Sequence, residues 1–541
     1  MPPMPPALLA LLAVAAALFA TGIHWGMPHW FGWTADELHP TSWGEALSPR
    51  TYDGWHTRYP PLHFAVLQGL SWPLRLGLDA SGMPKLERTV WLIYFSRVVS
   101  LLLSLATVVL MDRIGREVHG PRTGLFAAAI LVCVAPYVYY AKMGNLDAPY
   151  IFWFAWSLLF FVRILKHHQA RDYALFALMA AAAVCTKDQA YGLYGLAPLP
   201  ILWSLARREH PGRNVLAGIG RSLIDRRFLL AAAAATVGFV VLQMIPWNLV
   251  RFTRHVELLV GPMSDNYQDY QNTPEGHGQL LALFLRQIVF CLNPALAAVA
   301  TAGTVWTLWR GSRGGAGSEP FLIGSLVFLV VSYYVTFLSQ ILFSFDRYIL
   351  PIALLLAFPA ARLLAEVTEP GQRLLALRRT AVAALFAWSF LYAASVDARM
   401  LVDTRYGVEA YVREHATRPG SAVAIGRRKH VPRFRFVDWE RALRREGRWF
   451  EGWLRRERPE YLAINVSDLR REGEIRLYQR LARGEMGYRL VRLQRGEPPL
   501  DLLELEERGT SQRFINPEIA LFERVDETPL SVSNSPVGNR P

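Results

Sequence analysis

The chain has 541 residues, of which 52% are hydrophobic and only 19% are charged. A soluble domain carries about 25% charged residues, so this composition excludes a single soluble enzyme, a fibrous protein and a disordered chain. The formal net charge is +14, but the sequence has no zinc knuckle, helix-turn-helix signature or basic-aromatic RNA motif, so we expect no nucleic-acid partner.

The first part of the chain is apolar, whereas residues 397–541 hold 28 of the 58 Lys and Arg and 23 of the 44 Asp and Glu. A membrane span needs about 20 mostly apolar residues. The sequence therefore predicts a polytopic helical membrane domain at 1–396, with about eleven spans and extensive contact with membrane lipids. The predicted spans are 7–23, 89–111, 123–141, 148–165, 173–185, 189–206, 228–250, 280–309, 320–343, 348–366 and 380–396.

The segment 59–78 decides the orientation of the predicted spans. It has the length of a span but contains Pro60, Pro61, Pro73 and Arg75. If it crossed, every later basic loop would face outward, against the positive-inside rule. We therefore predict a surface amphipathic or re-entrant segment. The N-terminus is then cytoplasmic, the tail is extracytoplasmic, and the protein is a multi-pass protein of the inner (plasma) membrane.

The charged tail alternates strand-like and helical patterns, which is typical of an α/β unit. We predict a soluble extracytoplasmic domain at 397–526, followed by a disordered tail at 527–541 that is rich in Ser, Pro and Asn. The predicted strands are 421–425, 461–466, 488–493 and 518–522, and the predicted helices are 406–415, 439–456 and 472–483.

An acidic pair, Asp36-Glu37, lies among tryptophans in the first outer loop, 24–88. A carboxylate pair at a bilayer surface can accept a proton from an acceptor or hold a metal. The alternative is a helix N-cap. Asp147 precedes an early proline in the fourth span, so it is either an N-cap or a contact of the site.

Basic side chains converge on the same face, and together with the carboxylates they indicate a phosphate-bearing substrate. They are Arg58, Arg97, Lys142, Lys187 and Arg347. For Lys142 and Arg347 the alternative is snorkelling at a helix end. Arg97 lies inside a span, where a charge is costly, so it either pairs with a carboxylate such as Asp147 or binds the phosphate.

The order of these motifs resembles that of the GT-C glycosyltransferases of the protein O-mannosyltransferase and aminoarabinose-transferase type, over residues 25–410. These enzymes use polyprenyl-phosphate sugars on the outer face of a membrane. The motifs are Trp33-Thr-Ala-Asp36-Glu37, Arg58-Tyr59-Pro60-Pro61-Leu62, Arg97, Gly144-Asn-Leu-Asp147, Thr186-Lys187, Asp346-Arg347-Tyr348-Ile-Leu-Pro351 and Asp403-Thr-Arg-Tyr406.

The resemblance implies a GT-C-like fold and a role for each residue. Asp36 is expected to be the general base, and Glu37 to orient it or to hold a metal or the acceptor. The expected ligands of the donor phosphate are Arg97, Lys187, Arg58 and Arg347, and the other expected substrate contacts are Asp147, Tyr348 and His56. Related sequences often have Glu-Lys before the prolines, with the glutamate associated with a metal. This chain has Arg58-Tyr59 there, which leaves a divalent metal open, and we expect no other cofactor.

The expected reaction is the inverting transfer of a monosaccharide from a polyprenyl phosphate to a lipid, glycan or protein acceptor. One alternative is a transporter or flippase for a lipid-linked substrate, although the sequence shows no repeat of the kind common in transporters. Another is a ligase-type relative that moves preassembled glycans. A ring of charges beside a lipid groove favours transfer, whereas a two-sided cavity at the bilayer midplane favours transport.

Overall fold

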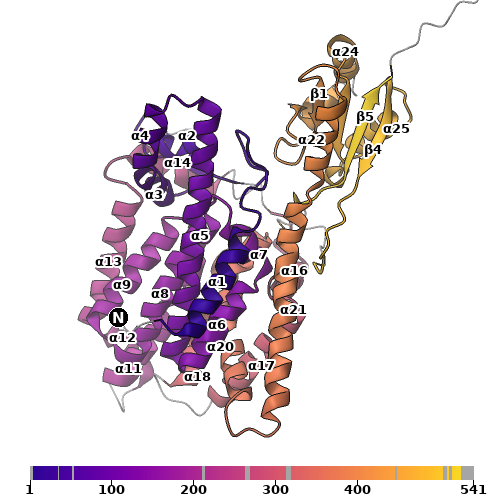
Figure 1. The fold of residues 1–541 in the computed structure, drawn as a ribbon. Helices are drawn as coiled ribbons and strands as arrows, with labels where there is room; N and C mark the ends of the chain where they lie inside the picture. Colours follow the sequence, from indigo (N-terminus) through magenta and orange to yellow (C-terminus); the bar gives the residue numbers. More distant parts are fainter. Residues whose placement is uncertain are drawn as a thin grey trace, which may run out of the picture. The chain divides into compact units, whose positions relative to one another are not determined.

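The computed structural model describes residues 4–34, 36–50, 54–209, 214–261, 268–311, 318–444, 448–503, 509–510 and 514–525. The chain forms two compact units (Figure 1). The helical unit comprises Met1–Leu401 and Pro499–Arg513, and the sheet unit comprises Val402–Pro498 and Phe514–Pro541. The predicted disordered tail, 527–541, lies outside the described residues.

A short piece of the charged tail, Pro499–Arg513, belongs to the helical unit. The charge pattern predicts that residues 499–513 belong to the soluble domain, but the described residues among them form hydrogen bonds with the helices. The Leu502 amide donates to the Ser395 hydroxyl at 3.1 Å, and the Gly509 carbonyl accepts from the Asp346 amide at 2.7 Å. These hydrogen bonds place the piece in the helical unit, a pairing that composition alone does not show.

Several helices of the helical unit are apolar and long enough to cross a bilayer. Five described helices meet this requirement alone, and up to seven spans result if each of two bent helix pairs counts as one. The protein is therefore an integral membrane protein. The longer helices are α1 (Pro6–Ala20), α5 (Lys85–Val118), α6 (Pro121–Val132), α8 (Asp147–His167), α9 (Ala170–Val184), α11 (Pro198–Glu209), α13 (Arg226–Leu242), α16 (Pro274–Leu292), α17 (Pro294–Gly311), α18 (Glu319–Tyr333), α20 (Asp346–Val367) and α21 (Leu375–Leu401).

Two stretches that the sequence analysis treats as single spans are sharply bent in the structure. Helix α6 and the short helix α7 (Ala135–Ala141) meet at 73°, and α16 and α17 meet at 112°. Proline begins or nearly begins the second helix of each pair, at Pro136 and Pro294. Because proline lacks the amide hydrogen and cannot continue a straight helix, both breaks have a local cause.

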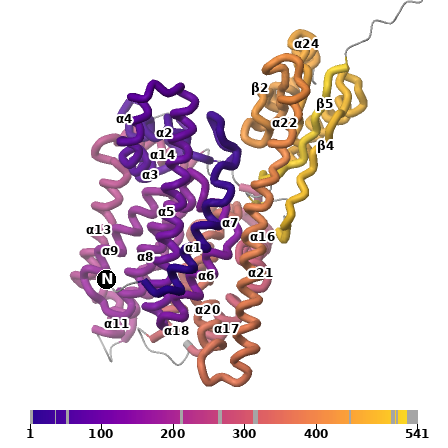
Figure 2. The backbone as a smooth tube through the Cα atoms, in the orientation of Figure 1, coloured from indigo at the N-terminus to yellow at the C-terminus, as the bar shows by residue number. Residues whose placement is uncertain are grey.

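The ambiguous segment 59–78 forms two short helices, α3 (Leu62–Leu70) and α4 (Trp72–Ala80). Each has nine residues and is therefore about 14 Å long, which is too short to cross a hydrocarbon core of about 30 Å. Together with α2 (Pro40–Glu45) and α14 (Leu249–Val260), they lie at one end of the helical unit, and α11 lies at the opposite end (Figures 1 and 2).

The sheet unit contains a five-stranded sheet in the order β2-β1-β3-β5-β4. β1 is parallel to β2 and β3, whereas β5 is antiparallel to β3 and β4. The strands are β1 (Ala422–Ile425), β2 (Arg435–Val437), β3 (Tyr461–Asn465), β4 (Tyr488–Gln494) and β5 (Ile519–Arg524), and the helices are α22 (Thr404–His415), α23 (Trp439–Leu443), α24 (Arg448–Glu457) and α25 (Glu472–Ala482).

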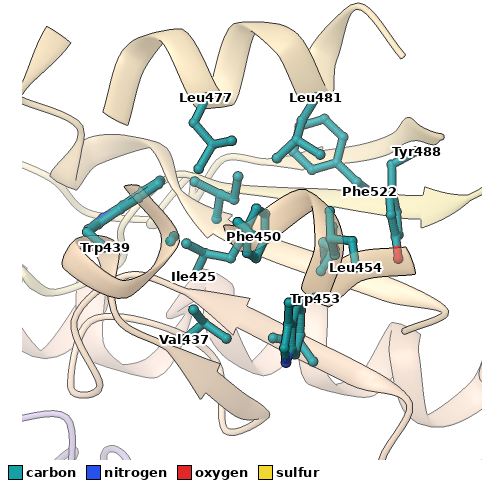
Figure 3. Packing of buried hydrophobic residues seen from close by; sticks show 14 of the residues in the cluster. Ile425, Val437, Trp439, Phe450, Trp453, Leu454, Leu477, Leu481, Tyr488 and Phe522 are labelled. Carbon is teal, nitrogen blue, oxygen red and sulfur yellow. The ribbon is translucent and has the colours of Figure 1, made fainter. Parts of the chain in front are cut away.

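Helices cover both faces of this sheet, so its central strands are buried on both sides. In β3, Leu462 and Ile464 face the core that α23, α24 and α25 complete (Figure 3). Tyr461 and Ala463 face the core that α22 completes. This alternation follows from the two-residue repeat of a strand, and it explains why β3 reads as a continuous apolar run.

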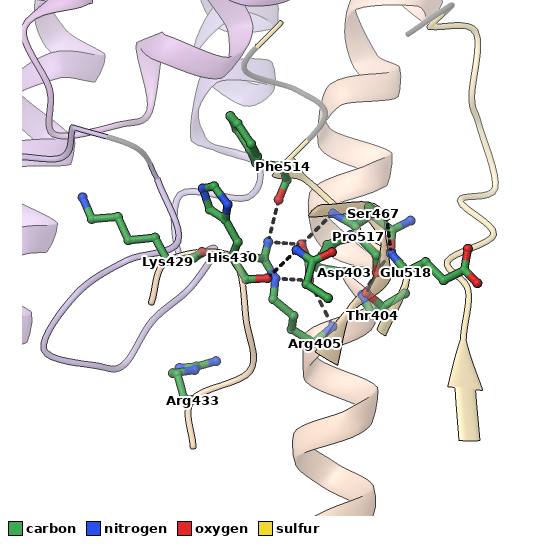
Figure 4. A network of polar contacts seen from close by, with 12 residues as sticks. Asp403, Thr404, Arg405, Lys429, His430, Arg433, Ser467, Phe514, Pro517 and Glu518 are labelled. Atoms are coloured by element: carbon green, nitrogen blue, oxygen red, sulfur yellow. Dashed lines mark hydrogen bonds and ion pairs between the residues drawn. The ribbon is translucent and has the colours of Figure 1, made fainter. Parts of the chain in front are cut away.

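A buried arginine joins several segments of the sheet unit. Arg405 donates to both carboxylate oxygens of Asp403, at 2.8 and 2.7 Å, and to the carbonyls of Lys429 and Phe514, at 3.0 Å each (Figure 4). The motif that contains these two residues therefore has a structural role at the start of α22, because the bidentate pair satisfies a charge that is fully buried.

Candidate active site

The two carboxylates of the first loop have different environments although they are adjacent in sequence. The Asp36 side chain is 34% exposed and its Oδ2 accepts from Arg347 Nη1 at 2.6 Å. The Glu37 side chain is 4% exposed. The backbone of Asp36 has a φ of 57°, in the left-handed region that is unfavourable for most residues. This turn directs the two side chains to different partners, and such strain is typical of functional sites.

Glu37 forms a buried bidentate ion pair with Arg97. Its carboxylate accepts from Arg97 Nε at 2.7 Å and from Nη2 at 3.0 Å. Arg97 Nη1 also donates to the carbonyls of Ile23, at 2.5 Å, and Trp25, at 2.9 Å. The fully buried guanidinium therefore binds the first loop to α5. Arg97 thus forms an ion pair, one of its two predicted roles, but its partner is Glu37 and not Asp147.

A glycine leaves the space that this ion pair occupies. A Cβ atom on Gly32 would lie 2.2 Å from Glu37 Oε2 and 2.4 Å from Arg97 Nη2, closer than atoms can approach. The first loop therefore requires glycine at this position for the pair to form.

A second ion pair joins Asp147, at the start of α8, to Lys187, in the turn after α9. Lys187 Nζ lies 2.5 Å from Asp147 Oδ1. It also lies 5.4 Å from the ring centroid of Tyr150 and 6.0 Å from that of Tyr348. Burial lowers the pKa of Lys187 to about 8, although the Asp147 carboxylate acts in the opposite direction. The ammonium is thus held by one carboxylate and two aromatic faces.

Arg347 lies in the first turn of α20, where the partial positive charge of the helix dipole adds to its own. Its guanidinium carbon is 5.6 Å from the ring of Phe345 and 5.7 Å from that of Tyr348. A cation at a helix N-terminus raises the local positive potential, and such a position favours an anion such as phosphate.

Tyr59 shows how closely these groups lie together. Burial raises the pKa of the Tyr59 hydroxyl well above its ordinary value, the charge of Asp36 raises it further, and Arg347 lowers it. The charges of Asp147 and Tyr348 also act on Tyr59. Two ion pairs and the ring of Tyr348, which lies near both cations, link five of the predicted residues. We call them the Asp36 site: Asp36, Asp147, Lys187, Arg347 and Tyr348.

The remaining predicted residues lie on the short helical turn Trp55–Arg58. Arg58 is exposed at the end of this turn. The His56 ring is buried, with Nδ1 3.6 Å from Glu45 Oε2. Within the described ranges, no three His, Cys, Asp or Glu residues gather in a way that could hold a metal ion.

Helix α14 contributes two contacts that the sequence analysis does not single out. Arg251 Nη2 donates to the carbonyls of His56, at 3.3 Å, and Tyr59, at 2.5 Å. Its neighbour one helical turn later, His255, contacts the Thr57 carbonyl at 2.8 Å through Nδ1 and Asp188 Oδ1 at 3.0 Å through Nε2. The one sequence signal for them is their i,i+4 spacing on an amphipathic stretch of the predicted outer loop.

The helical unit thus brings carboxylates and cations together in one cluster. Residues 91–218 match the family model described as dolichyl-phosphate-mannose-protein mannosyltransferase. This match confirms the predicted resemblance to glycosyltransferases that use polyprenyl-phosphate sugars. The matched segment contains Arg97, Asp147 and Lys187 but neither Asp36 nor Arg347. No curated protein matches the sequence.

Solved structures are similar to the chain at low identity. The archaeal oligosaccharyltransferase AglB from Archaeoglobus fulgidus, in complex with an inhibitory peptide and a dolichol-phosphate, is 13% identical, with 85% of this chain and 69% of that chain covered and a TM-score of 0.45. ArnT from Cupriavidus metallidurans in the apo state is 13% identical, with 95% and 97% covered and a TM-score of 0.47. The protein O-mannosyltransferase Pmt1-Pmt2 complex of S. cerevisiae, bound to the sugar donor, gives 15% identity, 46% and 34% coverage and a TM-score of 0.33.

Proposed function

We propose that the protein transfers a monosaccharide from a polyprenyl-phosphate donor to an acceptor hydroxyl or phosphate on the outer face of the membrane, with inversion at the anomeric carbon. The observation that carries this proposal is the contact between Asp36 and Arg347, at 2.6 Å. It places a partly exposed carboxylate beside a cation at a helix N-terminus. A proton acceptor and a phosphate ligand are thus adjacent, as the reaction requires.

In the proposed reaction, the donor phosphate replaces Asp36 as the partner of Arg347, and this exchange frees the Asp36 carboxylate. Asp36 then takes the proton of the acceptor hydroxyl while the oxygen of that hydroxyl attacks the anomeric carbon. The bond from that carbon to the phosphate oxygen breaks, and the polyprenyl phosphate leaves with the bonding electrons. Arg347 and Lys187 stabilise the growing charge on the phosphate, and the sugar passes through an oxocarbenium-like state.

Glu37 and Arg97 have a positioning role in this proposal. Their buried ion pair fixes the loop that carries Asp36, and the Gly144 amide donates to Glu37 Oε1 at 3.3 Å. This contact connects the same carboxylate to the segment that leads into Asp147. The ion pair therefore sets the distance between the two halves of the Asp36 site without touching the reacting atoms.

An apolar cavity of about 360 Å³ in the helical unit supports a lipid-linked donor. Its wall includes Gln287, whose Nε2 donates to the Gly509 carbonyl at 3.2 Å, and that carbonyl also binds the Asp346 amide. Hydrogen bonds through Gly509 therefore link the wall of the cavity to the first turn of α20, which carries Arg347. In this proposal the cavity takes part of the lipid chain, and such an apolar site next to the helix that carries Arg347 favours transfer over two-sided transport. The lining residues are Leu283, Leu285, Arg286, Gln287, Val289, Phe290, Pro294, Trp388, Tyr392, Leu502 and Thr510.

The proposal is tested by deletion and complementation, with mass spectrometry of envelope glycans and lipids as the readout. Deletion of the gene is expected to remove one sugar modification, and the wild-type gene to restore it. Asp36→Asn keeps the size of the side chain but removes the proton acceptor, so we expect activity about 10²–10⁴-fold lower. The matched control is Asp79→Asn, which removes an exposed carboxylate paired with Arg88. Restoration by Asp36→Asn at normal membrane content would reject Asp36 as the base.

A further inference from the structure

Lys142 directly follows α7, and the proposed transfer reaction does not use its side chain. Snorkelling at a helix end is the alternative that the sequence analysis gives for this lysine, but it is wrong, because the side chain is fully buried. Its Nζ forms an ion pair with Asp397 Oδ1 in α21 and donates to the Leu18 carbonyl in α1 at 3.0 Å. The ammonium therefore joins three elements that pack together, α1, α7 and α21.

The ion pair between Lys142 and Asp397 is poorly satisfied for a buried one. The Asp397 side chain is 6% exposed, and its second oxygen, Oδ2, is buried without a hydrogen-bond partner among the residues that the structure describes. Burial of two charges is favourable only when further hydrogen bonds satisfy both groups, and apolar side chains of similar size often stabilise a protein as well or better. Stability alone therefore does not account for this ion pair.

Gly144 lies two residues after Lys142 and contacts the first loop twice. Its amide donates to Glu37 Oε1 at 3.3 Å, and its carbonyl accepts from the Leu38 amide at 2.8 Å. Asp36 directly precedes these two residues of the loop. The position of Gly144 therefore determines where the backbone that carries Asp36 lies.

The same stretch of chain ends at Asp147, which forms the ion pair with Lys187. We call this stretch segment 142–147. The Asp147 amide donates to Asn145 Oδ1 at 3.1 Å, and the Asn145 amide donates to the Met143 carbonyl at 2.9 Å. These local hydrogen bonds make the segment a compact turn, so a displacement of its first residue would also displace Asp147.

We propose that Lys142 and Asp397 are positioning residues of the transfer reaction. Their ion pair fixes the place of segment 142–147 against α1 and α21, and the segment in turn sets the distance between the two halves of the Asp36 site. Neither residue touches the reacting atoms. This role rests on the proposed function, because the distance matters only if both halves of the site act on one substrate.

The test replaces the ion pair by apolar side chains of similar size, in Lys142→Met combined with Asp397→Leu. No charge is then left buried without its partner, so we expect the melting temperature of the purified full chain to be unchanged or higher. In the complemented deletion strain, the sugar modification should reappear after induction about 10–10²-fold more slowly than with the wild-type gene at equal membrane content, since a misplacement of about 1 Å can cost about 10²-fold.

The matched control is Asp112→Leu combined with Arg116→Leu, which removes another ion pair with a buried carboxylate. In this pair too, one carboxylate oxygen, Asp112 Oδ1, is buried without a hydrogen-bond partner among the described residues. The pair lies in α5 about four turns after Arg97, far along the helix from the Asp36 site. We expect the control to keep both its melting temperature and the wild-type rate.

Hydrogen exchange reports the position of segment 142–147 without any sugar donor. The Leu38 amide, which donates to Gly144, is expected to exchange about tenfold faster in the Lys142 and Asp397 double variant than in the wild type, and at the wild-type rate in the control. Equal exchange, a normal rate of modification, or a lower melting temperature of the double variant would each overturn the positioning role. Failure of the wild-type gene to restore any modification would instead reject the proposed function, and the role in transfer with it.

Discussion

Loss of charge is predicted to destabilise the protein at one of the two adjacent carboxylates of the first loop, Glu37, and not at the other, Asp36. Glu37→Gln would leave the Arg97 guanidinium fully buried without its carboxylate, and breaking one side of a buried ion pair costs about 3–5 kcal/mol. Asp36 and its partner Arg347 both keep contact with solvent, so the charge left by Asp36→Asn is hydrated and its cost is small. We expect Glu37→Gln to lower the melting temperature of the purified protein and Asp36→Asn to leave it nearly unchanged.

A double variant shows whether the ion pair causes this difference. When both partners of a pair are replaced, no uncompensated charge remains, so Glu37→Gln combined with Arg97→Gln should be less destabilised than the sum of the two single variants. Arg97→Lys should also be destabilised, because lysine cannot reproduce the bidentate contact. A melting temperature for Glu37→Gln equal to that of the wild type would mean that Glu37 does not hold the loop.

His255 on α14 contacts two other segments, the helical turn that contains Thr57 and the turn that contains Asp188. The charge of its ring determines how many hydrogen bonds link the three segments. Its two nitrogens face the Thr57 carbonyl and the Asp188 carboxylate, and both of these groups only accept hydrogen bonds. Neutral imidazole has one N–H, so both bonds form only when the ring carries two protons. Burial lowers the pKa of His255 and Arg251 lowers it further, but the Asp188 charge and hydrogen bond together with the Thr57 hydrogen bond outweigh them, so the net pKa is raised.

The sign of the resulting pH dependence follows from this raised pKa. The contribution of the doubly protonated ring is complete below the unfolded pKa of about 6.5 and is lost as the pH rises through the folded pKa. Hydrogen exchange of residues 54–59, corrected for the intrinsic rate, should therefore show less protection at alkaline than at mildly acidic pH. His255→Gln should remove this difference and the control His277→Gln should keep it. Equal protection of the wild type at both pH values would contradict the imidazolium link.

At the element scale, the sequence predicts what depends on continuous apolar patterns and fails where a contact involves the backbone. β3 was predictable because both of its faces are buried. β2 was not, since it has three residues and two of them, Arg435 and Phe436, are exposed. The position of α14 was also not predictable: the i,i+4 spacing of Arg251 and His255 is its one sequence signal, and three of their four contacts are with backbone carbonyls, which the residue pattern does not reveal.

The Asp36 site shows the same contrast. Its members were brought together in the sequence analysis by the predicted sidedness of their loops, and the structure places five of them in one cluster. The ion-pair partners were less predictable: Arg97 pairs with Glu37, and Asp147 pairs with Lys187. The predicted side of the membrane tells which end of the helical unit a residue lies at. It does not tell which of several nearby carboxylates a cation pairs with, because that depends on the packing of the side chains.

The two ends of the helical unit carry different sets of charged contacts. At one end, Glu117 lies 3.1 Å from Arg163 and 3.6 Å from Lys166, and Glu319 lies 2.5 Å from Arg362. These are loops that the positive-inside rule assigns to the cytoplasm. The Asp36 site gathers the loops that the same rule assigns to the outside. These contacts show which loops share an end of the unit, and the side of the membrane that each end faces stays a prediction.

Cysteine labelling with a membrane-impermeant reagent tests this orientation in intact cells. The native Cys133, Cys185 and Cys291 are buried, so single new cysteines at exposed positions can be compared on that background. We expect labelling at Ser81→Cys, just after α4, and at Ser467→Cys in the sheet unit, and protection at Arg208→Cys near the end of α11. All three should react after the membrane is permeabilised. If the helical unit had the opposite orientation, Ser81 would face the cytoplasm and Arg208 the outside. Labelling of Arg208→Cys with protection of Ser81→Cys would therefore overturn the predicted orientation. The Asp36 site would then face the cytoplasm, where transfer to an outer-face acceptor could not take place.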